Sequence, residues 1–152
     1  MRVFINGESK EVSGTPSLAE LIDQLDLSDG IVLLPPLSRE ILAAVYRQAH
    51  LVLQPSDAEG FGLPVIEALA CGTPVVASDL PVLREVGGSG ATYAAVADID
   101  GWSEAVSSLL HERIGQPEKW SQRRSVGLAR SREFTWSKFA SGIADLYRDV
   151  IA

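Results

Sequence analysis

At 152 residues and 46% hydrophobic content, the chain is long enough for one domain with a single core. Its formal net charge of −7 at pH 7 repels a phosphate backbone, which argues against nucleic-acid binding. No window approaches the roughly 20 apolar residues of a membrane-spanning helix, and Met1-Arg2 leads into an alternating polar strand rather than the apolar core of a secretory leader. We therefore expect a cytoplasmic protein with no membrane span. The single cysteine, Cys71, and the absence of clustered His and Cys predict no disulfide and no metal site.

The N-terminal segment predicts a β-hairpin followed by a helix. Arg2 to Val12 alternates like two short strands joined by an Asn6-Gly7 turn. Ser17 to Leu27 carries apolar residues at helical spacing, with Pro16 and a serine cap at its start.

From residue 30 onward the pattern predicts an α/β domain with a mostly parallel sheet, because helical segments connect successive strands. The strands are expected at Ile31–Leu34, His50–Gln54, Pro74–Ala77 and Ala91–Val96. The helices are expected at Ser38–Ala49, after Pro64, at Trp102–Glu112 with Asp98 or Asp100 as its cap, after Pro117, and at Ser137–Ile151. We interpret Arg123, Arg124, Arg130 and Arg132 as a solvated helix face.

The run from Gln54 to Asp79 carries the strongest functional signal. Gly60 and Gly62 lack a Cβ, so their backbone N–H groups can approach a bulky anion. Pro64 fits the first turn of a helix, and the free N–H groups and dipole of that helix start favour a phosphate. Glu59 lies in the loop and Glu67 about one turn into the helix, so one acid can face a sugar and the other a ribose.

This run resembles the donor-site signature of the family 4 retaining glycosyltransferases, two-domain enzymes of the GT-B fold that use nucleotide-activated sugars. The matching residues are Pro55-Ser56, Glu59-Gly60-Phe61-Gly62-Leu63-Pro64, Glu67-Ala68 and Gly72-Thr73-Pro74-Val75-Val76-Ala77. The resemblance implies that Glu59, the candidate catalytic residue, lies against the donor sugar. It further implies that the backbone of Gly60, Phe61, Gly62 and Leu63, with Pro64, holds the sugar hydroxyls and diphosphate, and that Glu67 accepts hydrogen bonds from the ribose.

The resemblance extends to the end of the chain, through Asp79–Val86, Gly87–Gly90 and the aromatic run Phe134-Thr135-Trp136. It implies a Rossmann-like three-layer sandwich, the C-terminal half of GT-B, over about residues 31–152. It also implies no essential metal and no cofactor.

The first 28 residues depart from that family's pattern, which places a strand with a basic phosphate loop and an acceptor-binding domain ahead of the donor loop. They resemble the start of the ubiquitin-like, β-grasp sulfur carrier of thiamine biosynthesis. We therefore expect one α/β domain over residues 1–152, made of a ββα graft at 1–29 and a glycosyltransferase donor-binding half-domain at 30–152. The graft is either a natural rearrangement or an engineered chimera.

These patterns predict a domain that binds a nucleotide-diphosphate sugar for retaining glycosyl transfer, with little or no turnover alone. Two alternatives remain open: a non-catalytic structural or interaction module, and a related GT-B epimerase or phosphorylase. The last helix carries an apolar face that could fold back on the N-terminal graft or meet a second copy of the chain, and of these we predict a homodimer through this helix. The face consists of Phe139, Ile143, Leu146, Tyr147 and Val150.

Overall fold

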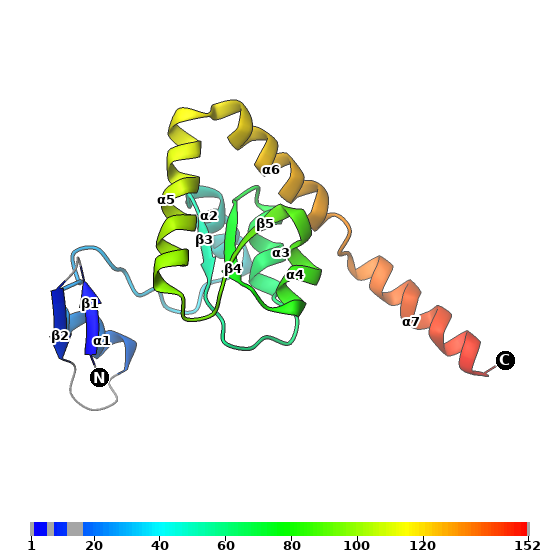
Figure 1. Cartoon of the computed structure of the whole chain (residues 1–152). Helices are drawn as coiled ribbons and strands as arrows, with labels where there is room; N and C mark the ends of the chain where they lie inside the picture. Colours follow the sequence, from blue (N-terminus) through cyan, green and yellow to red (C-terminus); the bar gives the residue numbers. More distant parts are fainter. Residues whose placement is uncertain (1, 6–7, 12–16, 152) are drawn as a thin grey trace. The chain divides into compact units, whose positions relative to one another are not determined.

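The computed structural model describes residues 2–5, 8–11 and 17–151. Two compact units make up the chain, residues 1–38 and residues 39–152 (Figure 1). The sequence places the corresponding boundary at residues 29 and 30 within a single domain. That domain assignment, and the origin of residues 1–29, stay predictions.

The first unit contains an antiparallel hairpin and a capped helix. Its elements are β1 (Arg2–Ile5), β2 (Glu8–Glu11) and α1 (Leu18–Gln24). The Ser17 hydroxyl accepts a hydrogen bond from the backbone N–H of Glu20, whose carboxylate accepts one from the backbone N–H of Ser17. This reciprocal capping box satisfies two donors at the helix start. The predicted strand pair and serine cap are confirmed, whereas Asn6, Gly7 and Pro16 lie outside the described residues.

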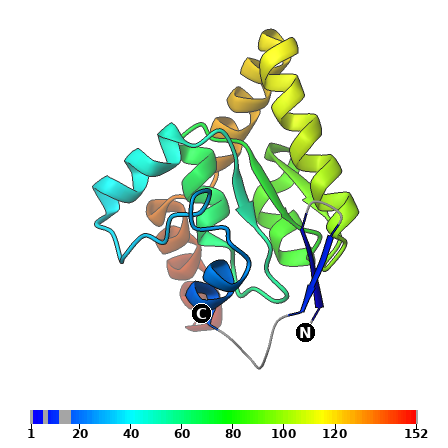
Figure 2. The ribbon, with the colours of Figure 1, turned by 90° about the vertical axis from the view of Figure 1, so that its left-hand side faces the viewer.

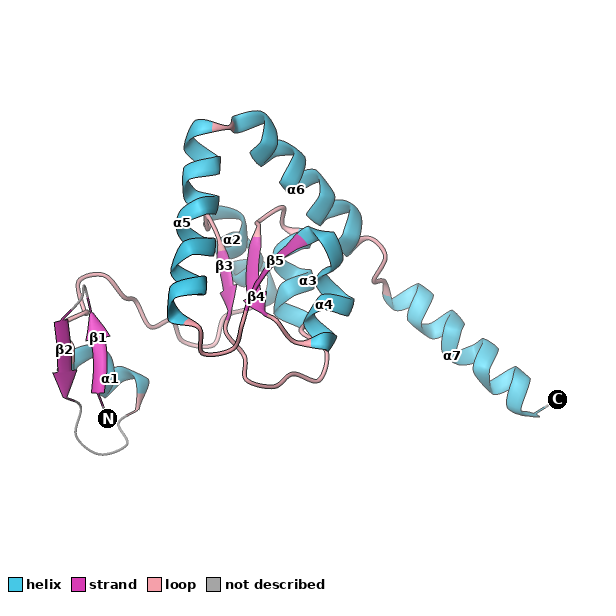
Figure 3. Cartoon of the chain, viewed as in Figure 1, coloured by secondary structure: helices cyan, strands magenta, loops and turns pink. Residues whose placement is uncertain are grey.

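The second unit is an α/β domain. Its elements are α2 (Arg39–Gln48), β3 (Val52–Gln54), α3 (Leu63–Ala70), β4 (Val75–Ser78), α4 (Pro81–Gly87), η1 (Gly88–Gly90), β5 (Ala91–Ala94), α5 (Ile99–Gly115), α6 (Pro117–Ser131) and α7 (Trp136–Ile151). The strands pair in the order β3-β4-β5 and all run parallel, so β3 and β5 border the sheet (Figure 3). Each pair is connected through a helix, as parallel pairing requires.

Alternate residues of β4 divide the core into two layers. Val75 and Ala77 pack in one cluster with the buried faces of α3 and α4, whereas Val76 packs on the other side of the sheet with Leu109 of α5. Successive side chains of a strand point to opposite faces, so one buried strand supports both clusters. Figure 2 shows α2 and α5 on opposite sides of the sheet. The predicted three-layer α/β class with a parallel sheet is thereby confirmed.

The strand predicted at Ile31–Leu34 is wrong. Residues 31–38 form no regular element, and Ile31 to Leu34 are exposed. A strand needs a neighbour to pair its N–H and C=O groups, and none of the described strands pairs with this segment. Apolar β-forming residues therefore do not suffice to make a strand here.

The interpretation of the α6 arginines as a solvated face is also wrong for three of the four. Arg124 Nε donates to the carbonyl oxygen of Gly72 at 2.7 Å, and Arg130 Nε donates to that of Val86 at 3.0 Å. Both acceptors lie at or just after helix C-termini, where carbonyl groups lack intrahelical donors. The guanidinium groups thus join α6 to the ends of α3 and α4.

Arg123 makes the third contact and joins α6 to α5. Its Nε and Nη2 atoms donate to the Glu112 carboxylate at 2.7 and 3.0 Å, and Lys119 Nζ lies 3.0 Å from the same carboxylate. The Glu112 side chain is 5% exposed. The hydrogen bond from Arg123 holds the pKa of Glu112 down at about 2, with a further contribution from Lys119.

Candidate functional site

The site predicted from the sequence lies in the β3–α3 loop (residues 55–62), at the carboxyl ends of the parallel strands. Ligands of open α/β sheets bind at this edge. β3 ends at Gln54 and α3 begins at Leu63, with Pro64 in its first turn as predicted. The loop therefore runs from a sheet edge directly into a helix N-terminus.

The two glycines of the loop have different environments. Gly62 is the N-cap of α3 with φ of +90°, and a Cβ there would lie 2.5 Å from Leu83 Cδ2. A Cβ on Gly60 would meet no protein atom within 4 Å. The fold itself thus requires glycine at position 62, whereas the space beside Gly60 is open.

Four consecutive amides at this turn are unpaired, and of their residues Gly62 is buried whereas Gly60, Phe61 and Leu63 are exposed. Within the described part of the chain, the backbone N–H groups of residues 60–63 donate no hydrogen bond to another protein group. The first N–H that is satisfied is that of Val65, which donates to the carbonyl oxygen of Gly62 at 3.0 Å. Consecutive unpaired N–H groups at a helix start form an anion-binding concavity.

Glu59 is held through one of its two carboxylate oxygens. Gln54 Nε2 and Ser56 Oγ donate to Oε1 at 2.6 and 2.9 Å, and Gln54 Nε2 also lies 2.8 Å from Ser56 Oγ. Among the described residues, no donor is paired with Oε2. The half-buried carboxylate is thus oriented by two neighbours and keeps one oxygen for a ligand. Gln54 and Ser56 were assigned no role from the sequence. The signal that could have found them is an amide side chain five positions before Glu59 and a hydroxyl three positions before it.

Glu67 lies on the exposed side of α3, and its carboxylate accepts a hydrogen bond of 3.5 Å from the Tyr46 hydroxyl of α2. The Tyr46 backbone carbonyl in turn accepts one of 2.5 Å from Thr73 Oγ1. Burial raises the pKa of Tyr46, and the charge of Glu67 adds to this effect. Glu67 and Glu59 thus have different hydrogen-bond partners among the described residues.

A cavity of about 340 Å³ adjoins the loop. It lies between the loop and the start of α5, and is lined by Pro55, Asp57, Ala97, Ile99, Trp102 and Ser103. The α5 cap is Asp98, one of the two caps predicted, whose Oδ1 accepts from the N–H of Gly101 at 3.1 Å. Cavities of this size hold small ligands.

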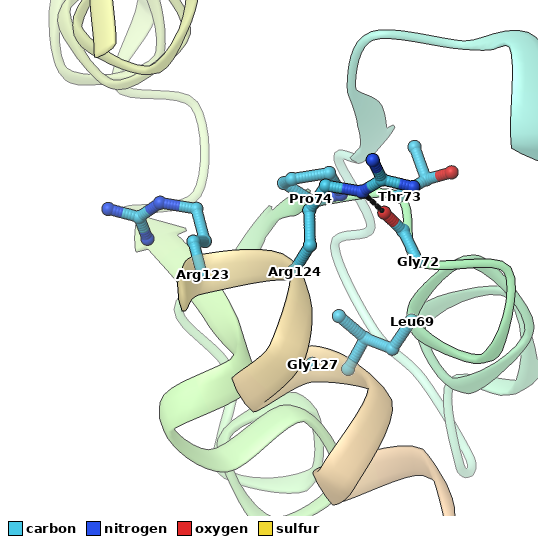
Figure 4. A pocket seen from close by; sticks show the side chains of 7 residues that line it. All are labelled: Leu69, Gly72, Thr73, Pro74, Arg123, Arg124 and Gly127. Carbon is cyan, nitrogen blue, oxygen red and sulfur yellow. Dashed lines mark hydrogen bonds between the residues drawn. The ribbon is translucent and has the colours of Figure 1, made fainter. Parts of the chain in front are cut away.

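A second gap, too narrow to hold a water molecule, lies near the amino end of β4, away from the loop (Figure 4). The hydrogen bond from Arg124 to the carbonyl of Gly72 crosses it. We assign it to helix packing.

Acidic side chains dominate the carboxyl edge of the sheet. Asp57 and Glu59 lie in the loop, and Asp79 follows β4. The nearby Arg84 donates two hydrogen bonds to Asp79, one of them at 2.8 Å, and stacks over the ring of Tyr93 at 4.7 Å. Its charge is therefore already matched, which leaves the backbone N–H groups of the loop as the donors for an anion.

Comparison with known proteins places the fold in a family. Residues 2–125 match the family model described as Glycosyl transferases group 1. The chain belongs to the group 1 glycosyltransferases. The match begins ahead of Ile31, where the resemblance in the sequence was expected to start, and it ends within α6.

Individual relatives agree with this assignment. The D-inositol 3-phosphate glycosyltransferase of Mycobacterium marinum (strain ATCC BAA-535 / M) is 35% identical over 156 residues, which cover 99% of this chain and 33% of that protein. The protein of the same description from Mycobacterium sp. (strain KMS) is 41% identical over 114 residues, 72% of this chain and 26% of that one. The structure of sucrose-phosphate synthase from Thermosynechococcus elongatus aligns with a TM-score of 0.77 and 28% identity, over 88% of this chain and 33% of that chain.

The chain thus matches between about a quarter and a third of the length of these relatives. The predicted glycosyltransferase family and its GT-B Rossmann-like fold are confirmed. In the described part of the chain, no helix combines the length and apolar character needed to cross a bilayer.

Proposed function

We propose that this domain binds a nucleotide-diphosphate sugar as the donor for retaining glycosyl transfer. The observation that carries the proposal is the row of unpaired amides at residues 60–63, placed directly after an acid that is held through a single oxygen. Backbone N–H groups at a helix start suit a diphosphate. A fixed carboxylate oxygen suits a sugar hydroxyl.

Each predicted residue takes a role in this proposal. The amides of Gly60, Phe61, Gly62 and Leu63 hold the diphosphate, and Pro64 sets the start of the helix that carries them. Oε2 of Glu59 faces the donor sugar. Glu67, oriented by the Tyr46 hydroxyl, accepts hydrogen bonds from the ribose.

We infer little sugar transfer by this chain alone. Arg84, which follows β4 at this edge, is paired with Asp79. Arg130, which stacks over Phe134, is paired with Glu133, so the charge of a departing diphosphate would meet mainly the amide dipoles of the loop. Transfer also requires an acceptor held against the donor, and such positioning contributes many orders of magnitude to rate. The cavity beside Trp102 is open, but it carries no cationic side chain.

A second candidate function, as an interaction module, is favoured by α7. None of its residues is buried, and its apolar face is exposed, including Phe139 at 63% and Leu146 at 59%. A homodimer through this helix stays a prediction, and the mass of the protein in solution tests it. A strictly monomeric species at high protein concentration would contradict the predicted homodimer.

Calorimetric titration with nucleotide diphosphates and with their sugar conjugates tests the proposed function. We expect both ligand classes to bind. Glu59→Gln should lose the added affinity that the sugar brings while nucleotide binding remains, and Glu67→Ala should lose the preference for a ribonucleotide over its deoxyribose analogue. Glu118→Gln, which changes an exposed acid of α6, is the matched control. A folded chain that binds no nucleotide would contradict the donor-binding proposal and favour the interaction module.

A further inference from the structure

An aromatic contact joins the β3–α3 loop to the junction between α6 and α7 (residues 132–135). The ring of Phe61 meets the ring of Phe134 edge to face, with centroids 5.9 Å apart and an interplanar angle of 79°. Phe134 is 73 positions away in the sequence (134 − 61). This geometry is the favoured one for aromatic pairs, and it stabilises beyond the area it buries.

Phe134 is itself fixed by the end of α6. The Arg130 guanidinium stacks over its ring at 4.8 Å, and the backbone N–H of Phe134 donates to the carbonyl of Ser131 at 3.1 Å. Arg130 also donates to the carbonyl oxygens of Glu85 and Val86 in α4. Its side chain is 24% exposed and carries an ion pair with Glu133. Phe134 is therefore held in place by α6 and, through Arg130, by α4.

Phe61, the other residue of the aromatic pair, lies within the run of unpaired amides at residues 60–63. Phe61 separates Gly60, which has open space around it, from Gly62, which is fixed in the left-handed region against Leu83. A glycine with open space on one side leaves this segment free to change its dihedral angles. Phe61 is 43% exposed, so its contact with Phe134 supplies a lateral restraint.

We propose that Phe134 is a positioning residue, which holds the Phe61 ring and thereby orients the amides of residues 60–63 toward an anionic ligand. The ligand class is the diphosphate of the proposed function, on which this inference rests. Phe134 acts through Phe61 and touches no ligand. Pre-ordering of the amides lowers the entropy lost on binding.

A double-mutant cycle tests the coupling. Phe61→Leu, Phe134→Leu and the double variant are titrated with uridine diphosphate, and the NMR backbone order parameters of residues 60–63 are measured without ligand. We expect each single variant to bind about 3–10-fold more weakly, and the double variant to bind no more weakly than the weaker-binding single variant. The order parameters of residues 60–63 should be lower in Phe134→Leu, and Phe134→Tyr should restore both properties.

Phe139→Leu is the matched control. It removes the same aromatic ring from α7, where Phe139 packs edge to face with Trp136 at 6.1 Å. We expect unchanged affinity and unchanged order parameters at residues 60–63 in this variant. If Phe134→Leu fails to fold, Phe134→Met takes its place in the cycle, because methionine retains most of the volume without the ring.

Additive losses in the cycle, or unchanged order parameters at residues 60–63 in a folded Phe134 variant, would overturn the inference. The proposed function fails separately, if the unmodified chain binds no nucleotide diphosphate. In that case the order parameters still decide whether Phe134 orders the loop.

Discussion

Single residues of the β3–α3 loop divide into those the fold requires and those that leave room for a ligand. Gly62 belongs to the first group and Gly60 to the second. We expect Gly62→Ala to lower the free energy of unfolding by about 1–3 kcal/mol, because alanine is strained at positive φ and its Cβ meets Leu83. Denaturant unfolding measures this change.

Gly60→Ala is the counterpart substitution. No protein atom lies near the added methyl group, so stability should stay within about 0.5 kcal/mol of the unmodified chain. Nucleotide affinity should nevertheless fall, since the methyl group occupies the space an anion needs. Equal binding by Gly60→Ala and the unmodified chain would place the ligand elsewhere.

Gln54 offers a test of how Glu59 is oriented. Gln54→Met keeps the size of the side chain but removes the donor to Oε1, so Glu59 becomes freer to rotate. We expect a loss of about 1–2 kcal/mol in binding of a nucleotide sugar and a smaller loss for the bare nucleotide. Calorimetry compares the two ligands, with Gln48→Met on the exposed end of α2 as control. Equal losses for both ligands would count against a sugar contact by Glu59.

The sequence identifies the candidate acids and glycines but not their supports. Glu59, Glu67 and the two glycines stand out because their spacing around a helix start is recognisable. The bond from Gln54 to a single carboxylate oxygen depends on how the loop turns, and the ring of Phe134 arrives from a distant part of the chain. Such contacts follow from tertiary packing. The roles of the predicted site residues stay predictions until ligands are tested.

At the scale of elements, the α5–α6 pair is held by a buried acid. The Glu112 pKa is lowered to about 2 in the folded chain by hydrogen bonding to Arg123. A carboxyl group with a lowered pKa stabilises the fold above its ordinary pKa near 4.5, and this stabilisation is lost as pH falls from about 4.5 toward 2. We expect the unfolding midpoint to drop across that window, as measured by thermal melts at stepped pH.

Glu112→Gln isolates this contribution. The variant should be less stable by about 2 kcal/mol at pH 7, because Arg123 and Lys119 lose their charged acceptor. Its stability should also change less between pH 4.5 and 2. Glu104→Gln, at an exposed acid of α5, is the control. A parallel acid response in Glu112→Gln and the unmodified chain would assign the effect to other carboxyl groups.

Local sequence signals predicted most helices and strands correctly. They failed where the structure of a segment depends on a contact with a distant part of the chain. Prolines and caps mark the starts of α3, α5 and α6, because these residues satisfy local constraints of a helix start. The apolar run at Ile31–Leu34 looks like a strand, but no described strand pairs with it. The spacing of the α6 arginines predicts a solvated face, because helical spacing is the same whether the guanidinium groups donate to water or to carbonyl oxygens of the protein.

At the scale of the whole molecule, the two units predict a separable domain. Both core clusters of the α/β sheet consist of residues within 39–152. We therefore expect a chain of residues 39–152 to fold with an unfolding midpoint close to that of the full chain, and to bind the same nucleotides. Melting curves and titrations of the shortened chain check this. Loss of cooperative unfolding would show that residues 1–38 complete the core.

β3, a strand of three residues, forms one edge of the sheet. No other described strand pairs with its outer side. Unpaired N–H and C=O groups at a sheet edge can pair with a strand of another molecule, and the short length of β3 limits how far such pairing extends. Leu53, which is 48% exposed, adds an apolar side chain to this edge. We therefore expect weak, concentration-dependent self-association through this edge, measured by light scattering, and Leu53→Lys should reduce it.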